Sequence, residues 1–509
     1  MQPGSAYDIL IIGGGINGAG IARDAAGRGL RVALCERGDF AGATSSASTK
    51  LIHGGLRYLE HGELRMVRDA LSEREALLAI APHISRQLRF VLPHVRELRP
   101  AWMIRLGLLL YDHLGTRSSL PRSYGVDLRG SHYGAALKAD LRKGFVYSDG
   151  WVDDARLVIL NLRSAQFHGA TILPRTRFVA ARPERRSWRA RLQRSDGRWI
   201  DLEARVLVNA AGPWVDDVLS ATTVVPSRPR VRLVKGSHIV VQRLYDGDHA
   251  YLLQNDDRRV VFVIPFGANH TVIGTTDLAV ESPLVPMTSS PAEVEYLCQA
   301  ARRYLRQAVA PEQVVWSYAG VRALFDDRHR DPASITRDYT LALDEVNGSI
   351  ALSILGGKLT VYRRLAEAAL AKLHRRLETR RGTWTAGEPL PGGDLGTGGM
   401  NALIDRLRAR YPALPPLLLQ TLAQRHGALS DEILGDARSE SDLGIHFGAH
   451  LFEREVDYFI RYEWAQTGDD VLWRRTKAGL DMPAPERIRV HDYVRERANE
   501  APSPAREGG

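Results

Sequence analysis

The chain has 509 residues, 44% of them hydrophobic, which is the composition of a folded protein. This length exceeds what a single hydrophobic core usually holds, so we expect two or three domains. Its two cysteines, Cys35 and Cys298, lie far apart, which argues against a disulfide scaffold or a zinc site and fits a reducing compartment. The net charge of +10 favours anionic partners, and no apolar run approaches the length of a membrane span.

A glycine-rich turn follows the first predicted strand. The apolar run 9–12 leads into Gly13-Gly14-Gly15-Ile16-Asn17-Gly18, and a helix rich in small residues is expected over 17–28. In a G-x-G-x-x-G turn, glycines allow a tight bend, close approach of a pyrophosphate to the helix N-terminus, and close helix–strand packing. A second strand, 31–34, ends near Glu36, where an acidic side chain accepts ribose hydroxyls. This order predicts a dinucleotide-binding unit; a glycine-rich turn without a ligand is the alternative.

Residues 38–58 read GDFAGATSSASTKLIHGGLRY, which is rich in small hydroxyl residues. Such a segment does not build a core, but it suits backbone and hydroxyl contacts to a cofactor, and Gly54 and Gly55 permit close approach. An amphipathic helix is expected over 64–81, and 82–100 is less regular. Residues 102–114 predict a helix that either dips into lipid headgroups or packs on the core.

The middle of the chain carries a small antiparallel insertion and a second glycine turn. The expected elements are a helix over 155–168 and strands over 171–173, 188–192, 199–202 and 206–208. The last strand ends in Asn209-Ala210-Ala211-Gly212-Pro213, which resembles the second fingerprint of FAD proteins, where the chain returns beside the first strand. Together with the first turn, it favours FAD over NAD.

From residue 230 the pattern becomes β. Short β-branched runs at 237–242, 259–264 and 271–273 predict an antiparallel substrate domain. A helix over 291–308 and strands over 314–324 and 350–355 follow. The final strand ends in Gly356-Gly357-Lys358-Leu359-Thr360 and opens a helix to about 377, whose N–H groups and dipole would face the electron-rich edge of a reduced flavin. Residues 388–400 are expected to be a linker, 401–497 a helical domain and 498–509 a disordered tail.

A series of motifs falls in order along residues 7–480, namely GGGINGAG, ATSSAS-KLIHGGLRYLEHGELR, YSDGWVDDARL, NAAGPWV, KGSHIVV, IGTTD, AGVRAL, ITRDY and GGKLTVYR. The series resembles the FAD-dependent glycerol-3-phosphate dehydrogenases of the aerobic, membrane-associated type. The resemblance implies an α/β fold, with an FAD-binding Rossmann-like domain of the glutathione-reductase/D-amino-acid-oxidase type, an inserted antiparallel β substrate domain and an all-helical C-terminal domain. We expect the first two to share residues 1–387, with insertions at roughly 60–150, 170–203 and 225–330. Ala211 and Ala323 depart conservatively from the family pattern.

The resemblance implies FAD as the cofactor, held by several separate segments, and no metal. The residues expected to contact FAD are Gly13, Gly14, Gly15, Asn17, Gly18, Glu36, Thr44, Ser45, Ser46, Lys50, His53, Gly54, Ala210, Ala211, Gly212, Gly356, Gly357, Leu359 and Thr360.

Oxidation at C2 of a phosphorylated polyol needs a base for the hydroxyl proton, cations for the phosphate and a positive neighbour for the reduced flavin. The resemblance implicates His238 in substrate handling, and histidine is the natural base near neutral pH. A hydrogen-bonded structural histidine is the alternative, and His53 competes for the role or contacts flavin instead.

Cationic and hydroxyl side chains complete the expected pocket. Arg57 and Arg337 are assigned mainly to phosphate and Arg322 to the C2 oxygen, although each alone fits a surface arginine. Tyr58 is expected to donate to phosphate or close the pocket, and Lys358 to lie near flavin and substrate. The segment Thr275-Thr276-Asp277 is expected to shape the pocket without a catalytic role.

The resemblance implies oxidation of sn-glycerol 3-phosphate to dihydroxyacetone phosphate by hydride transfer to FAD, with electrons passed to a membrane quinone. The resemblance also implies a cytoplasmic protein bound peripherally to the inner face of the cell membrane, and a homodimer is an assembly the sequence allows. The alternatives are a glycerol-3-phosphate oxidase using O2, an amine or amino-acid oxidase of the same fold, and a basic flavin-containing binder of nucleic acid. No zinc finger or RNP-type strand favours the last, so we expect no nucleic acid partner.

Overall fold

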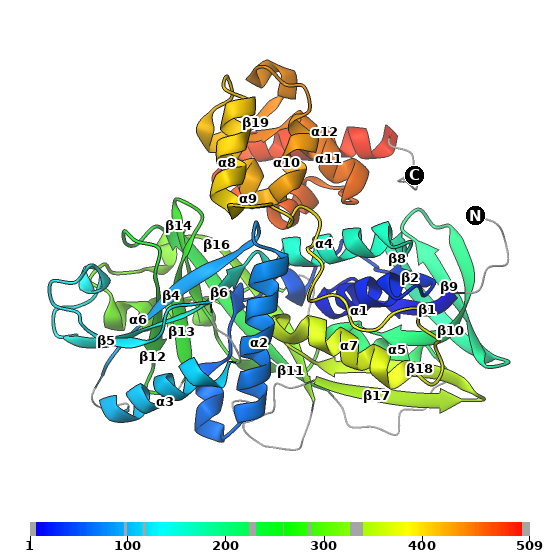
Figure 1. Cartoon of the computed structure of the whole chain (residues 1–509), viewed down its shortest axis with the longest axis horizontal. Coiled ribbons are helices and arrows are strands. Elements are labelled where there is room, and N and C mark those ends of the chain that lie inside the picture. Colours follow the sequence, from blue (N-terminus) through cyan, green and yellow to red (C-terminus); the bar gives the residue numbers. More distant parts are fainter. Residues whose placement is uncertain are drawn as a thin grey trace.

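The computed structural model describes residues 7–95, 99–115, 119–222, 231–257, 259–283, 287–325 and 339–500, without the side chains of Arg57, Glu60, His61, Phe325, Asn499 and Glu500. Two β-sheets stand side by side, and a helical domain lies above them (Figure 1). The expected fold class, an α/β nucleotide-binding domain with an inserted β domain and a helical C-terminal domain, is confirmed.

The sheet that begins with the first strand, sheet A, has the strand order β17-β18-β10-β1-β2-β7. Its neighbouring strands from β18 to β7 run parallel, and β17 runs antiparallel to β18. β8 and β9 form a hairpin, and β9 pairs antiparallel with the first half of β10, whereas the second half of β10 pairs with β1. The strands are β1 (Tyr7–Ile12), β2 (Val32–Cys35), β7 (Thr171–Leu173), β8 (Thr176–Glu184), β9 (Ser187–Arg194), β10 (Trp199–Asn209), β17 (Tyr339–Val346) and β18 (Ser349–Gly356).

Side chains alternate along each strand, so sheet A buries both faces. Ile9 and Ile11 pack into a core with the helices on one face, and Leu10 and Ile12 pack on the other face with Trp188 of the hairpin. The helices are α1 (Ile16–Gly27), α4 (Asp154–Phe167) and α7 (Tyr362–Leu373) on the first face and α5 (Val215–Ser220) on the second. This near-continuous apolar character is typical of parallel strands.

The second sheet, sheet B, has the strand order β15-β11-β14-β13-β12-β4-β6-β3, with β16 also paired to β11 and β5 to β6. Helices α2 and α3 cover one face, and α6 packs on the other. The helices are α2 (Leu64–Ile80), α3 (Ala101–Leu114) and α6 (Pro291–Tyr304). The strands are β3 (Leu51–Ile52), β4 (Ser85–Pro93), β5 (Tyr124–Asp127), β6 (Lys143–Val152), β11 (Val231–Gln242), β12 (Ala250–Gln254), β13 (Val260–Phe266), β14 (His270–Gly274), β15 (Leu278–Val280) and β16 (Val314–Phe325).

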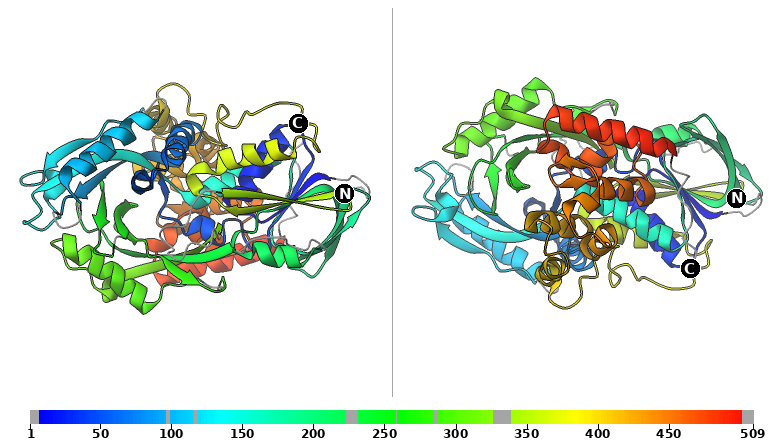
Figure 2. Two further views of the ribbon diagram at one scale, coloured as in Figure 1. Left: turned by 90° about the horizontal axis from the view of Figure 1, so that it is seen from below. Right: turned by 90° about the horizontal axis from the view of Figure 1, so that it is seen from above.

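The C-terminal domain lies across the junction of the two sheets when seen from above (Figure 2). It docks through buried ion pairs, in which Arg475 binds Asp39 at 2.6 Å and Arg156 of α4 binds Glu463. Besides its helices it contains one short strand pair. Its elements are α8 (Gly399–Arg410), α9 (Pro416–His426), α10 (Ser430–Leu434), β19 (His446–Gly448), β20 (Leu451–Phe452), α11 (Glu453–Tyr462) and α12 (Ala484–Glu500).

Most expected elements appear within a few residues, but sheet B is larger than the sequence indicated. The segment 82–100, expected to be irregular, contains β4. Strand β6 includes Asp149 and Gly150, two residue types that are uncommon in strands. Asp149 is buried because Arg74 of α2 binds it at 2.8 Å, so a charge that argues against a buried strand is neutralised by another element. The expected strands 199–202 and 206–208 are one strand, β10.

Candidate active site

The turn between β1 and α1 brings backbone atoms close together. Gly13 has a φ of 113°, and a Cβ there would lie 2.5 Å from the carbonyl oxygen of Ala210. A Cβ on Gly18 would lie 2.0 Å from the carbonyl oxygen of Gly13, so only glycine lets α1 pack this closely on β1. Gly15 is the N-cap of α1, whose first N–H groups and positive dipole end favour an anion.

Glu36 follows β2 and faces this turn. Its carboxylate accepts hydrogen bonds from the N–H of Gly14 at 2.7 Å and of Gly38 at 2.8 Å. Burial raises the pKa of Glu36, and the two backbone donors oppose that rise. Since each carboxylate oxygen has two lone pairs, both still have capacity to accept a ribose hydroxyl.

The short turn Thr44–Ser46 connects the first helix to sheet B. Ser45 Oγ accepts the N–H of Ile16 at 3.0 Å, and Thr44 Oγ1 donates to the carbonyl oxygen of Val321 at 2.7 Å. Ser46 Oγ donates to Ala43 at 3.2 Å. Strand β16 is therefore fixed beside the glycine turn at the residue that precedes Arg322.

The second glycine turn lies against the first. The N–H of Ala210 donates to the carbonyl oxygen of Ile12 at 2.9 Å, and the N–H of Ala211 donates to Asn209 Oδ1 at 3.3 Å. Gly212 has a φ of 57° and begins a short 3-10 turn.

The loop after β18 meets the N-terminus of α1. Asn17 Nδ2 donates to the carbonyl oxygen of Gly356 at 3.2 Å, and a Cβ on Gly357 would lie 3.2 Å from Asn17 Nδ2. Asn17 Oδ1 is buried without a hydrogen-bond partner among the described residues. A buried amide oxygen needs a donor, so this atom indicates a ligand or water beside the two turns.

The His53–Tyr58 segment lies beside the same loop. The N–H of His53 donates to Thr360 Oγ1 at 3.3 Å, and the N–H of Gly54 donates to the Tyr111 hydroxyl at 2.8 Å. The ammonium of Lys358 lies over the ring of Tyr58, 3.7 Å from its centre. Leu359 begins the 3-10 turn Leu359–Val361, which leads into α7. The Arg57 side chain and all of Arg337 lie outside the described residues.

Lys50 is buried in an ion pair. Its ammonium lies 2.5 Å from Asp154 Oδ1 and 3.1 Å from the carbonyl oxygen of Ser46. Both side chains are almost fully buried, with 2% of Lys50 and none of Asp154 exposed. The cation therefore joins the Thr44–Ser46 turn to the N-terminus of α4, and its contact with FAD stays a prediction.

His238 lies in β11 and is 1% exposed. Its Nε2 is 2.9 Å from Thr49 Oγ1, its ring stacks on Tyr318 at 4.8 Å, and a Cβ on Gly274 would lie 2.1 Å from its Cδ2. Burial lowers the pKa of His238, and the charges of Arg322 and Lys50 lower it further. The imidazole is therefore neutral near pH 7, as a proton acceptor must be.

Arg322 lies in β16, opposite Val234 of β11. Its Nη1 is 2.5 Å from Asp277 Oδ1, and a Cβ on Gly236 would lie 3.0 Å from its Nη2. The loop that carries Asp277 is itself held, because Thr276 Oγ1 accepts the N–H of Ser237 at 2.9 Å and donates to Glu293 at 3.0 Å.

Two residues that contact His238, Thr49 and Tyr318, were not singled out from the sequence. Asp277 lies in the quoted motif IGTTD, which was expected only to shape the pocket. Tyr318 lies four residues before Arg322 in a strand, so the period of two places both on one face of β16. Thr49 carries no signal beyond its place in a hydroxyl-rich loop, because its partner is 189 residues away.

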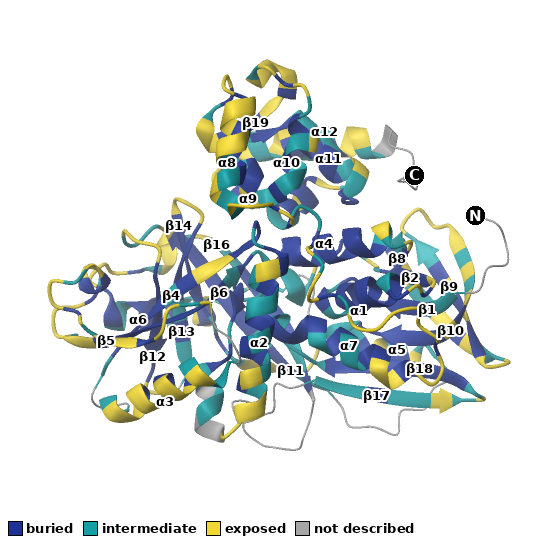
Figure 3. Ribbon diagram, viewed as in Figure 1, coloured by how far each residue is buried: buried dark blue, intermediate teal, exposed yellow. Residues whose placement is uncertain are grey.

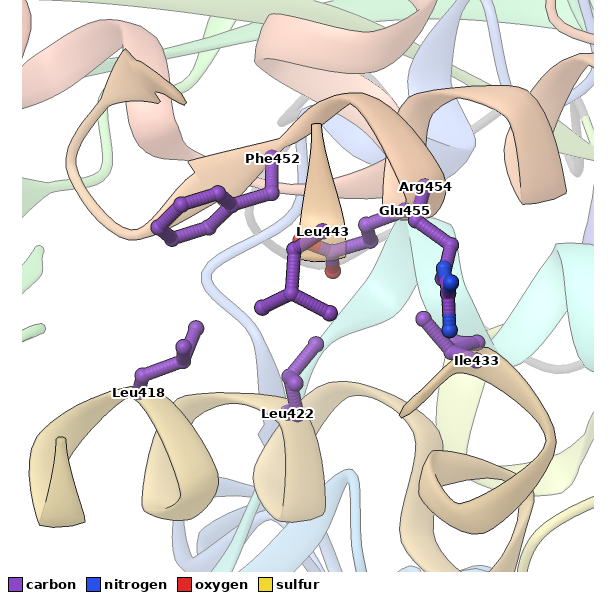
Figure 4. Close-up of a pocket in the computed structure, with 7 residues that line it drawn as sticks. All are labelled: Leu418, Leu422, Ile433, Leu443, Phe452, Arg454 and Glu455. Atoms are coloured by element: carbon purple, nitrogen blue, oxygen red, sulfur yellow. The ribbon is translucent and has the colours of Figure 1, made fainter. Parts of the chain in front are cut away.

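A small hollow lies elsewhere, inside the C-terminal domain (Figure 4). It measures about 10 Å³, which is room for about one water molecule. The lining residues are Leu418, Leu422, Ile433, Leu443, Phe452, Arg454 and Glu455. None belongs to the glycine turns, so the hollow is separate from the candidate site.

Comparison with known proteins finds similarity over almost the whole chain. Residues 8–363 match the family described as FAD dependent oxidoreductase, and residues 383–487 match the C-terminal domain of alpha-glycerophosphate oxidase. A glycerol-3-phosphate dehydrogenase of Pseudomonas aeruginosa is 51% identical over 489 residues, covering 96% of this chain and 95% of that protein. A D-erythritol 1-phosphate dehydrogenase of Brucella abortus is 47% identical over 481 residues, covering 94% and 96%. The crystal structure of the glycerol-3-phosphate dehydrogenase from Bacillus halodurans complexed with FAD has a TM-score of 0.73 at 24% identity, covering 98% and 95% of the two chains.

Proposed function

Since the chain belongs to the FAD-dependent glycerol-3-phosphate dehydrogenases, within the family of FAD dependent oxidoreductases, we propose that it oxidises sn-glycerol 3-phosphate to dihydroxyacetone phosphate. One observation links this activity to the candidate active site. The 2.7 Å bond from Thr44 Oγ1 to Val321 fixes Arg322 beside the turn that follows the nucleotide fingerprint. A cation is thereby supplied where cofactor and substrate domains meet.

The residues present fit FAD. The glycine turn would admit a pyrophosphate at the N-terminus of α1, Glu36 would accept the ribose hydroxyls, and Asn17 Oδ1, which has no hydrogen-bond partner among the described residues, would accept a donor from the ligand. When bound, FAD supplies a two-electron acceptor for the hydride from C2.

The chain's own residues bind the substrate and accept its proton. We assign Arg57 and Arg337 mainly to the phosphate, and Tyr58 to the phosphate or to closing the pocket. Arg322 stabilises the negative charge that develops on the C2 oxygen, and neutral His238 accepts the hydroxyl proton. Lys358, held over Tyr58, supplies a positive charge at the loop that meets Asn17.

An anaerobic titration with glycerol 3-phosphate tests the activity. Purified protein should carry oxidised flavin, and its visible absorbance should fall as substrate is added. Retained colour at saturating substrate would refute the proposal. N-methyl amino acids, which an amine oxidase would accept, should leave the absorbance unchanged, and a gel shift should detect no nucleic acid binding.

D-Erythritol 1-phosphate is a second candidate substrate, because the relative that acts on it is nearly as similar to this chain as the glycerol-3-phosphate dehydrogenases are. Comparing kcat/KM for the two phosphates in one assay decides between them. A higher value for the four-carbon substrate would replace our assignment while keeping the chemistry.

We further propose that the protein attaches peripherally to the inner face of the cell membrane through α3. Among the described helices, none combines the length and apolar character that crossing a bilayer requires. Helix α3 is nevertheless apolar on both sides, since Ile104, Leu108 and Tyr111 are buried while the opposite face is exposed (Figure 3). The exposed large apolar side chains, 39–69% accessible, are Trp102, Met103, Leu106, Leu109 and Leu110, and the basic residues Arg105 and His113 are exposed on the same helix. Such a face suits the headgroup region of a bilayer.

Sedimentation with vesicles of phosphatidylethanolamine and phosphatidylglycerol tests the attachment. The double variant Leu106→Ser/Leu109→Ser should bind at least about tenfold more weakly, because each buried leucine contributes about 1.5–3 kcal/mol. Ile488→Ser, which removes a 57% exposed side chain from α12, is the matched control. Equal binding by both variants would contradict the role of α3.

A membrane quinone is the proposed electron acceptor, and this places the substrate oxidation at the membrane surface. Reduction of a soluble quinone analogue should account for substrate turnover, with little peroxide formed in air. Stoichiometric peroxide would instead identify an oxidase using O2. A homodimer stays a prediction, which the molar mass from light scattering tests.

A further inference from the structure

A continuous series of ring contacts runs from the C-terminal domain to His238. Trp473 stacks on Trp316 with ring centres 4.9 Å apart and planes at 22°. Trp316 contacts Tyr318 at 4.8 Å, and Tyr318 stacks on His238 at 4.8 Å with planes at 11°. Every contact lies within the range for favourable ring packing.

The strand periodicity of β16 explains the series. Every second residue of a strand lies on the same face, so Trp316, Tyr318 and Arg322 share one face of β16. Gly320 lies on this face between Tyr318 and Arg322, and a Cβ there would approach Ala47 at 3.1 Å. Tyr318 lies opposite His238 in the antiparallel pairing of β16 with β11. The same face thus carries the ring series at one end and the candidate catalytic arginine at the other.

The C-terminal end of the series is fixed by local packing. A Cβ on Gly479 would lie 2.8 Å from Cζ2 of Trp473, so the indole lies against backbone. Leu480 also packs against the cluster that contains Tyr318 and Trp316. The neighbouring Arg475 is held by its ion pair with Asp39, which ties this segment to the FAD domain.

His238 has one occupied and one unoccupied nitrogen. Nε2 is 2.9 Å from Thr49 Oγ1, whereas Nδ1 is buried without a hydrogen-bond partner among the described residues. With the hydroxyl accepting from Nε2–H, the lone pair resides on Nδ1, which is then the basic atom. A buried imidazole that has one nitrogen without a partner must be held in orientation by packing. The aromatic ring of Tyr318, which Trp316 supports, supplies that packing.

We propose that Trp473 is a positioning residue of the catalytic site, which acts through Trp316 and Tyr318 to hold His238 dry and in one orientation, while Thr49 sets its tautomer. The proposal rests on the role of His238 as the base. It gives the C-terminal domain a part in catalysis, although that domain supplies none of the expected substrate or cofactor contacts.

The charges around His238 set the direction of the effect. Arg322 of β16 and Lys50 of the loop before β3 are positive, and Asp154 of α4 lies 2.5 Å from Lys50. Burial is the largest cause of the lowered pKa of His238. Removing the indole admits water, so the pKa should rise toward its ordinary value and the base should be protonated at higher pH.

The test is the pH dependence of kcat/KM for glycerol 3-phosphate in Trp473→Ala and Trp473→Phe. We expect the acid limb of Trp473→Ala to move up by about one pH unit, so that kcat/KM falls about fivefold at the midpoint of the wild-type limb, about tenfold well below it, and changes little at pH 8. Trp473→Phe retains a ring and should restore the wild-type limb. An unchanged limb in a folded Trp473→Ala protein would overturn the proposal.

Arg175→Gln is the matched control, since it breaks another contact between the domains, the 2.7 Å bond to Asp470, without touching the rings. If the acid limb of kcat/KM shifts equally in Arg175→Gln, the shift results from a weakened contact between the domains in general, and the proposal is overturned. Thr49→Val keeps the shape of the loop and removes the hydroxyl, so it tests the same assignment even where Trp473→Ala fails to fold; its kcat should fall while KM changes little.

The underlying function is tested separately. Anaerobic bleaching of the wild-type protein by glycerol 3-phosphate shows the activity without reference to Trp473. His238→Asn should abolish the acid limb. Bleaching with an intact acid limb in His238→Asn would leave the activity standing and remove His238, and with it the role of the ring series.

Discussion

Lys50→Met should destabilise the protein by a predictable amount. The substitution removes the cation that lies 2.5 Å from the carboxylate of Asp154, and neither side chain is more than 2% exposed. Asp154 keeps the hydrogen bonds that Ser48 and the N–H of Ala155 donate to it, but its charge is left buried without a paired cation. Removing one partner of a buried ion pair costs about 3–5 kcal/mol. The FAD-binding and substrate domains together contain roughly 380 residues. With an unfolding entropy of about 2.1 cal/mol/K per residue for this unit, the unfolding midpoint should fall by about 4–6 °C.

Thermal unfolding of the FAD-free and the FAD-loaded protein measures the effect. Both forms should lose the same amount, because the pair stabilises the fold rather than the cofactor. Lys138→Met, at an exposed position, should change the midpoint little. Adding Asp154→Asn to Lys50→Met should cost less than the sum of the single changes. An unchanged midpoint in the FAD-free variant, together with weaker FAD binding, would refute this reasoning and make Lys50 a cofactor ligand.

Two further substitutions address the cofactor and the substrate. Gly18→Ala should produce protein with less than about a tenth of the wild-type flavin, measured by absorbance after gel filtration, because its Cβ would lie 2.0 Å from the carbonyl oxygen of Gly13; full flavin content would contradict the assigned turn. Asp277→Asn should lower kcat/KM by about tenfold with flavin retained, since a hydrogen bond to a charged group contributes about 1.5–3 kcal/mol and this pair is partly exposed. Unchanged kcat/KM would show that Arg322 needs no such partner.

Local signals in the sequence predicted the nucleotide-binding turn well. The glycines at 13, 15 and 18, the small residues of α1 and the position of Glu36 are short-range features. In the structure, neighbouring atoms leave little room for a Cβ at these three glycines, and the carboxylate of Glu36 accepts the N–H of Gly14. The fold class followed from the order of such motifs and from the resemblance that they support.

The remainder depended on contacts between distant segments. Asp149 reads as a break in a strand until Arg74, 75 residues earlier, neutralises it. Thr49 and His238 are 189 residues apart, so no local pattern connects them. The ion pair of Lys50 with Asp154, 104 residues away, was not expected from the sequence either, and the expected contact of Lys50 with FAD stays a prediction.

The order of strands in sheet A has a consequence for synthesis of the protein on the ribosome. β10 lies between β1 and β18, although residues 7–12, 199–209 and 349–356 leave the ribosome at very different times. At about 5–20 residues per second, β1 waits roughly 20–70 s for the sheet to be completed. During that interval the nascent chain presents unpaired strand edges, so its yield in the cell depends on chaperone protection as well as on the stability of the finished fold.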